Sequence, residues 1–341
     1  MKKTILACIA IVLCTVLLLG LLQALLMPKY MSASREGALI GEYYGESGDH
    51  DVLFIGDCEV YESFTPATLW EEYGITSYIR GSAQQLIWHS YYLLEEMLEK
   101  ETPKAVVYNV YAMKYGKPQD EAYNRMTLDG MKWSASKVSA INASMTEEES
   151  FLSYVFPILR FHSRWSQLSG EDVTYLFSKD KVSHNGYMMQ TAIVPREGQD
   201  RKPLELGDYT LPATAMTYLD KIRTLCDENG VELILVKAPT NTVKFYWYDE
   251  WDAQIDAYAE EHGLSYYNFI PLADEIGIDW STDTYDKGYH LNVWGAQKLT
   301  SYFGELLATE HGLSDRRGEE TTAEIWNAKL AAYIAERDGT N

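Results

Sequence analysis

The chain has 341 residues and a formal net charge of -21 at pH 7, with 50 acidic residues against 29 Lys and Arg. Nucleic acids are bound by clustered Lys and Arg, and the sequence has no such cluster, so its composition argues against a nucleic-acid partner. Four cysteines are too few for a disulfide framework in a chain of this length, so a hydrophobic core must hold the fold.

The first segment predicts a membrane helix. An apolar run of about 24 residues extends from Thr4 to Met27, and as a helix it covers roughly 36 Å, enough to cross a hydrocarbon core of about 30 Å. A secretory signal peptide has a shorter apolar region and a cleavage site, so residues 1–27 favour a retained anchor over a cleaved signal. Because Lys2 and Lys3 favour a cytoplasmic N-terminus, we expect a single-pass protein of the cell membrane with an extracytoplasmic C-terminal domain.

After a polar stalk expected at residues 28–50, residues 51–313 predict an α/β domain. Short apolar runs alternate with amphipathic segments, which is typical of βαβ units and a parallel sheet. The predicted fold is a three-layer, flavodoxin-like sandwich with a mostly parallel sheet. The expected strands are 52–55, 105–111, 231–236 and 266–269, and the expected helices are 65–73, 82–99, 212–229 and 249–262.

Two regions depart from this alternation. Residues 113–205 are rich in Ser, Met and aromatic residues, and their segment 156–165 looks helical. We expect them to form an inserted helical cap over the carboxyl ends of the strands, where open α/β sheets bind ligands. Residues 314–341 form a C-terminal tail, in which 325–337 predicts an amphipathic helix that docks on the body.

Two short motifs lie at opposite ends of the domain: FIGDCEVY at residues 54–61 and DTYDKGYHLNVWGA at residues 283–296. Together they resemble the first and last blocks of the SGNH (GDSL-like) hydrolase superfamily. In that family a Gly-Asp-Ser turn presents the nucleophile, and a late Asp-x-x-His loop supplies the base and its orienting acid. The HLNxxGA extension is similar to an envelope subgroup that includes the D-alanine transfer protein of lipoteichoic acid and the alginate-type O-acetyltransferases.

The resemblance implies that Cys58 is the nucleophile, His290 the general base and Asp286 the acid that orients it. A thiol paired with a histidine can take an acyl group. The sequence departs from the family in having Cys instead of Ser and four residues instead of three from Asp286 to His290. Gly288 could absorb the extra residue, and Asp283 is the alternative acid. Cys58 is also compatible with an inactive binding protein or with a buried, inert thiol.

The resemblance also implies an oxyanion hole made by the N–H groups of Cys58 and Gly81 and the side-chain amide of Asn109. A turn glycine and an ordinary strand-end asparagine are the structural alternatives. Other polar residues could bind substrate, with salt bridges inside the cap or simple loop turns as the alternatives. These residues are Arg125, Arg164, Lys237 and Asn241.

The expected function is an extracytoplasmic acyl esterase or acyltransferase that acts on a cell-envelope glycan or teichoic acid through a Cys-His-Asp site. Its expected partners are this polymer or a lipid-linked glycan, and a membrane-bound acyltransferase that would supply the acyl group. The alternative is a catalytically inactive binding or assembly protein of an envelope complex. The spacing of His and Cys lacks the patterns of zinc sites, so we expect neither a metal nor a cofactor.

Overall fold

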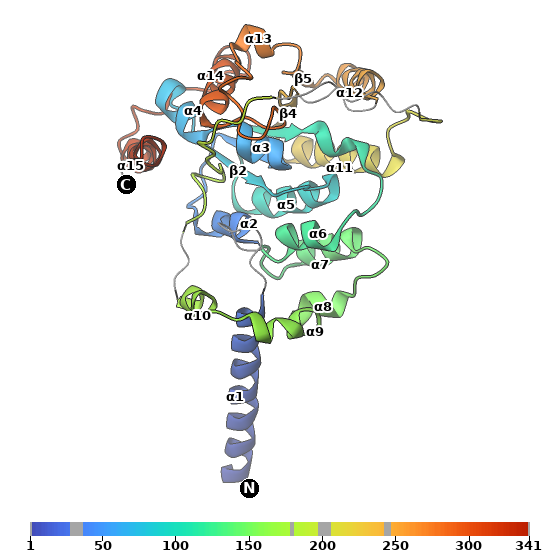
Figure 1. Ribbon diagram of the computed structural model, residues 1–341, viewed down its shortest axis with the longest axis vertical. Coiled ribbons are helices and arrows are strands. Elements are labelled where there is room, and N and C mark those ends of the chain that lie inside the picture. The colour runs from blue at the N-terminus through green and yellow to red at the C-terminus, as the bar shows by residue number, and fades with distance from the viewer. Residues whose placement is uncertain (1, 28–36, 178–180, 197–205, 242–246, 340–341) are drawn as a thin grey trace.

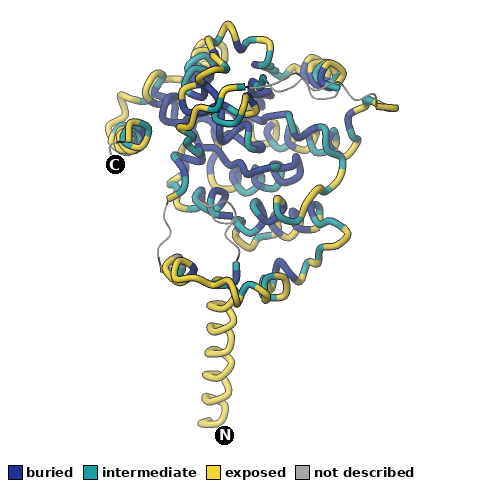
Figure 2. Tube along the Cα trace, viewed as in Figure 1, coloured by how far each residue is buried: buried dark blue, intermediate teal, exposed yellow. Residues whose placement is uncertain are grey.

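A computed structural model of the chain describes residues 2–27, 37–177, 181–196, 206–241 and 247–339. A single helix, α1 (Lys2–Leu26), projects from an α/β body (Figure 1). This helix is long and apolar enough to cross a membrane, and nearly all of it is exposed (Figure 2), apart from its end, where Leu26 is buried. A signal sequence near an N-terminus can have the same length and composition.

The body is built on a five-stranded parallel sheet with the strand order β2-β1-β3-β4-β5. This is the order of flavodoxin-like doubly wound sheets, so the predicted fold class is confirmed. The register sets Gly56 beside Gly81, which brings the carboxyl ends of β1 and β2 to one edge. The strands are β1 (Val52–Gly56), β2 (Ser77–Gly81), β3 (Ala105–Asn109), β4 (Glu232–Lys237) and β5 (Ser265–Asn268).

Helices cover both faces of the sheet and make the three-layer arrangement. One face is covered by α5 (Ile87–Lys100), α11 (Ala213–Asn229) and α12 (Tyr248–His262). The other face is covered by α3 (Cys58–Ser63), α4 (Pro66–Tyr73), α13 (Ala273–Ile276) and α14 (Val293–Thr309), with α15 (Glu320–Arg337) packed on α4.

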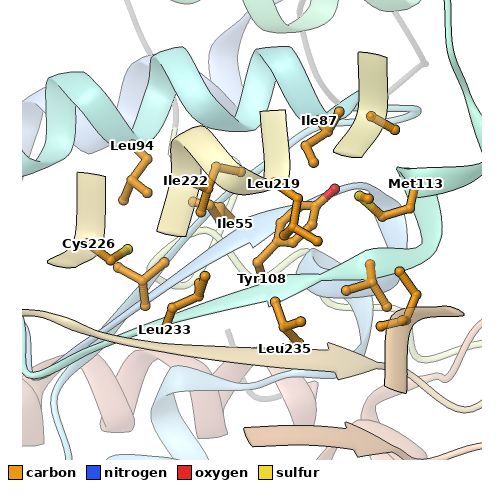
Figure 3. Close-up of a cluster of buried hydrophobic side chains, with 14 of the residues drawn as sticks. Ile55, Ile87, Leu94, Tyr108, Met113, Leu219, Ile222, Cys226, Leu233 and Leu235 are labelled. Carbon is orange, nitrogen blue, oxygen red and sulfur yellow. The ribbon is translucent and has the colours of Figure 1, made fainter. Parts of the chain in front are cut away.

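The core on the α5 side is closely packed (Figure 3). Leu233 and Leu235 of β4 face Leu219 and Ile222 of α11, and all four are buried. Each such side chain stabilises the fold by about 1.5–3 kcal/mol when it leaves water. Cys226 lies in the same cluster and is fully buried as a free thiol, so it acts as a small apolar packing group.

The insert of residues 113–205 has two parts. The helix at residues 135–144 packs on α5, and the later helices extend to α1 (Figure 1). Residues 181–196 return to the sheet, where the Met188 N–H donates to the Tyr61 carbonyl at 2.9 Å. The beginning of the insert also lies near the strand ends, since Lys114 interacts with the charges of Glu59 and Asp57, and residues 197–205 lie outside the described part of the chain. The insert follows η2 (Val110–Lys114) and contains α6 (Glu121–Leu128), α7 (Ala135–Ser144), α8 (Phe151–Val155), α9 (Ile158–Phe161), η3 (His162–Gln167) and α10 (Gly170–Phe177).

The second half of the expected stalk belongs to the folded body. α2 (Ala38–Glu42) and η1 (Tyr43–Gly45) begin just after Gly37. Ile40 and Tyr43 are fully buried, because their spacing puts both on one side of a helical turn. The Tyr43 hydroxyl donates to Glu101 at 2.7 Å. The stalk of residues 28–50 is therefore shorter than predicted, and its part 28–36 lies outside the described residues.

Arg80 is a charged residue buried inside β2. Its Nη2 pairs with Glu96 at 2.9 Å, and its Nη1 donates to the Leu93 carbonyl at 3.1 Å.

We expect Arg80→Ala to lower the free energy of unfolding by about 3–5 kcal/mol, because it leaves Glu96 buried without its cation. Chemical denaturation in detergent measures the change. The control is Arg223→Ala, which removes a more exposed pair with Asp227 on α11 and should change stability by less than about 1 kcal/mol; equal effects would contradict the prediction.

Candidate active site

The candidate nucleophile lies at the carboxyl end of β1, where parallel sheets bind ligands. Cys58 is the first residue of α3, and its side chain is partly exposed. Asp57 is the N-cap of this helix, and its carboxylate accepts a hydrogen bond from the Glu59 N–H at 3.2 Å. The turn therefore holds the thiol at the start of a helix, at the carboxyl end of the sheet.

The histidine loop folds so that it absorbs its extra residue. Lys287 and Gly288 both adopt positive φ, at 69° and 90°, and the Gly288 N–H donates to the Thr284 hydroxyl at 2.8 Å. The chain turns back on itself, and the His290 N–H donates to Asp286 Oδ1 at 2.8 Å. The spacing of four residues thus brings the carboxylate back to the histidine.

The three predicted triad side chains converge. His290 Nε2 lies 3.1 Å from Cys58 Sγ, and His290 Nδ1 lies 2.6 Å from Asp286 Oδ2. The imidazole remains 21% exposed, so a small substrate can reach it. Asp283, the alternative acid, instead binds Lys298 at 2.6 Å. Asp286 is therefore the carboxylate in contact with the histidine.

A second carboxylate, which the sequence analysis missed, faces the same imidazole. Glu62 Oε2 lies 3.5 Å from His290 Nδ1, and the Tyr285 ring stacks on the imidazole with a centroid distance of 6.1 Å. Burial raises the pKa of Glu62 to about 7, although His290 opposes this shift. Glu62 follows Cys58 by one helical turn, so the two side chains share a face of α3. That spacing is the signal by which the sequence could have revealed it.

The electrostatics of the site favour a neutral thiol at rest. Burial, assisted by Asp57, raises the pKa of the Cys58 thiol. Burial would lower the pKa of His290, but Cys58, Asp286 and Glu62 outweigh it and raise that pKa. The thiol is therefore neutral at neutral pH, and the surrounding carboxylates favour the imidazolium that forms when His290 accepts a proton.

A buried polar network packs against the turn that carries Asp57 and Cys58. Asn109 Nδ2 donates to Asp57 Oδ1 at 3.1 Å and to Glu59 Oε2 at 3.0 Å. Lys237 is fully buried, and its ammonium lies 2.8 Å from both oxygens of Glu59. The oxyanion role of Asn109 and the substrate-binding role of Lys237 remain predictions. In either role, the side chain would have to give up one of its bonds to Asp57 or Glu59 in order to bind the substrate. Burial, followed by the charge of Glu59, raises the pKa of Asp57 to about 6.

Gly81 lies against the same turn. A Cβ atom at this position would be 2.9 Å from the Gly56 carbonyl oxygen and 3.4 Å from that of Asp57. Because a side chain would push the turn away, the close approach of the two backbones requires glycine. Gly81 thus lies beside the Cys58 backbone, and its contribution to an oxyanion hole remains a prediction.

Of the three remaining candidate substrate-binding residues, Asn241 lies at the histidine loop, and Arg125 and Arg164 lie in the insert. Asn241 is at the site, where its N–H donates to the Gly288 carbonyl at 2.9 Å. Its side chain accepts a bond of 2.7 Å from Arg196, a cation that the sequence analysis missed. Arg125 forms ion pairs within the insert, and Arg164 donates to the backbone at the end of α1. A substrate-binding role for these residues remains a prediction.

Among the residues that the structure describes, no group of three or more His, Cys, Asp or Glu could hold a metal ion. No protein-family model matches the chain, and no curated protein sequence matches it.

Replacing Glu62 by Gln should stabilise the protein at alkaline pH. The unfolded chain loses the Glu62 proton near pH 4.5 and the folded protein near pH 7, so the contribution of this group to stability falls as pH rises through that window. Above it, Glu62→Gln should be more stable than the wild type by on the order of 3 kcal/mol. Urea unfolding in detergent at about pH 5 and about pH 8.5 tests this; a difference that does not grow with pH would contradict it.

Alkylation of Cys58 should be slow at neutral pH, because only the thiolate reacts and burial raises the thiol pKa. We expect the rate with iodoacetamide, followed by mass spectrometry of the Cys58 peptide, to rise at least about tenfold from pH 7 to pH 9. Glu62→Gln should shift the curve to lower pH, because it removes a negative charge near the thiol. Fast reaction already at about pH 6, with no further rise, would show a preformed thiolate instead.

Proposed function

We propose that this protein is an acyl-ester enzyme of the SGNH type, anchored in the cell membrane, in which Cys58 carries the acyl group. The observation that supports the proposal is the line of contacts from Cys58 Sγ to His290 Nε2 at 3.1 Å and from His290 Nδ1 to Asp286 Oδ2 at 2.6 Å. A nucleophile, a base and an orienting acid within hydrogen-bond reach are what acyl transfer requires.

In the proposed reaction, the Cys58 sulfur attacks the carbonyl carbon of an ester while its proton moves to His290 Nε2. The tetrahedral oxyanion is stabilised by N–H groups at Cys58 and Gly81. The carbon–oxygen bond then breaks, and the leaving alcohol takes the proton from His290. Water or an acceptor hydroxyl next attacks the thioester, with His290 again accepting and returning a proton, and this step releases Cys58. Hydrolysis and transfer thus share one intermediate and differ only in the second nucleophile.

The carboxylates around the imidazole suit this sequence of steps. Asp286 fixes the tautomer in which Nε2 faces the sulfur, and together with Glu62 it stabilises the imidazolium that forms during attack. The thiol is neutral before the reaction, so proton transfer accompanies attack, as in serine enzymes. A serine that replaces Cys58 should therefore fit the same mechanism.

The proposed location follows from α1. With Lys2 and Lys3 on the cytoplasmic side, the body lies outside the membrane. The proposed substrates are there too: a cell-envelope glycan, a lipid-linked glycan or teichoic acid as acceptor, and an acyl group delivered across the membrane by a membrane-bound acyltransferase. The catalytically inactive assembly protein is the alternative, and it is supported by the raised pKa of the Cys58 thiol.

Labelling with an activated small acyl ester tests the proposal. We expect a thioester on Cys58 of the wild type, detected by intact mass and reversed by hydroxylamine, and no acylation at this site in Cys58→Ala. His290→Ala should acylate at least about a hundredfold more slowly, because it lacks the base. Asp286→Asn should also be slower, because the amide no longer stabilises the imidazolium.

Cys58→Ser is the matched control, since it keeps the size and position of the nucleophile. It should form an ester on the introduced serine in a His290-dependent way and react with a fluorophosphonate probe. If neither the wild type nor Cys58→Ser is acylated while both are folded, the protein is the inactive binding partner. Acylation that does not depend on His290 would also overturn the proposed mechanism.

A further inference from the structure

One stretch of the insert exposes an unusual number of large apolar side chains. Residues 151–177 comprise α8, α9, η3 and α10, and Figure 2 shows much of this stretch as exposed. Trp165 is 73% exposed and Phe177 83% exposed. Water-facing surfaces rarely collect apolar groups of this size unless something covers them. The exposed set, which we call the apolar collar, is Leu152, Phe156, Leu159, Trp165, Leu168, Val173 and Phe177.

The collar lies at the body-proximal end of α1. Helices α9 and α10 and the turn η3 all contact α1, and Figure 1 shows α9 and α10 beside the point where α1 enters the body. Arg164 fixes this arrangement, since its Nη1 donates to the carbonyl oxygens of Leu26, at 2.9 Å, and of Met27. The guanidinium thus satisfies carbonyl groups that a helix end leaves without partners.

The length of α1 gives the height of the collar relative to a bilayer. Its 25 residues extend about 37 Å as a helix, somewhat more than the hydrocarbon core of about 30 Å. When α1 crosses the membrane, Leu26 is therefore at the outer boundary of the hydrocarbon. The collar touches this end of α1, so its side chains meet the interface between acyl chains and headgroups.

We propose that the apolar collar lies in the outer interface of the lipid bilayer and seats the body on the membrane surface around α1. The inference goes beyond the proposed catalysis and rests on the proposed membrane anchoring. Its occupant is lipid rather than protein because the surface is continuous with the membrane-crossing helix. Tryptophan and phenylalanine are also the residues favoured at this depth.

The charges near the collar predict which lipids matter. Arg160 pairs with Glu121, and Arg164 lies 3.5 Å from Asp172. Because these cations have carboxylate partners, the attraction to anionic headgroups is small and apolar burial supplies the stabilisation. The collar should therefore insert into zwitterionic phosphatidylcholine, and added salt should have little effect.

Quenching of tryptophan fluorescence by brominated lipid tests the collar. The full-length protein is reconstituted into phosphatidylcholine vesicles with or without bromines near the headgroup end of the acyl chains, and co-flotation verifies that α1 is inserted. We expect the brominated lipid to quench part of the wild-type emission, and Trp165→Phe to lose most of this quenched part. Trp165 is exposed, so the substitution leaves the packed core intact.

The matched control is Trp294→Phe, which removes another exposed tryptophan, on α14 at the other end of the body. It should keep the quenched part of the emission. If the brominated lipid quenches nothing, or if Trp165→Phe leaves the quenching unchanged, the body stands clear of the bilayer and the proposal is overturned. Repeating the measurement on Cys58→Ala should give the wild-type result, which separates the collar from the proposed catalytic activity.

Discussion

The buried ion pair between Lys237 and Glu59 is the interaction on which the site depends. Lys237 ends β4, Glu59 lies in the first turn of α3, and Asn109 at the end of β3 bonds to the same carboxylate. The network therefore ties the ends of two strands to the helix that carries Cys58. Charges buried this deeply are stable only when each has its partner. The position of the nucleophile thus follows from the sheet rather than from a flexible loop.

Much of the fold could be predicted from the sequence because most strands are continuous apolar runs, as buried parallel strands are. β2 was missed because Ser77 and Arg80 interrupt its apolar pattern. The partners that stabilise this buried arginine, which include Glu96, the Leu93 carbonyl and the Tyr44 hydroxyl, come together only in the folded structure. Cys58, His290 and Asp286 could be named from short motifs. Glu62 was missed although it follows Cys58 by one helical turn, because only the folded structure gives its distance of 3.5 Å from His290.

The site combines a soft nucleophile with surroundings rich in carboxylates. Asp57, Glu62 and Asp286 surround one thiol and one imidazole, and burial raises the pKa of the thiol. Such an environment disfavours a standing thiolate, which is the form of cysteine that is prone to oxidation. In the proposed reaction, it favours a thiol that loses its proton only when an acyl group is in place. The same carboxylates that raise the pKa of the resting thiol would stabilise the imidazolium formed in the proposed reaction.

The early start of the folded body changes how the protein would search for its substrate. Only residues 28–36 separate the end of the helix from the first residues packed in the body, and nine residues span at most about 31 Å when extended. With α1 in a bilayer, as proposed, the body cannot leave the membrane surface, and diffusion becomes a two-dimensional process. Encounters then depend on the surface density of acceptors rather than on their bulk concentration. A polymer anchored in the same membrane would be met far more often than the same polymer free in solution.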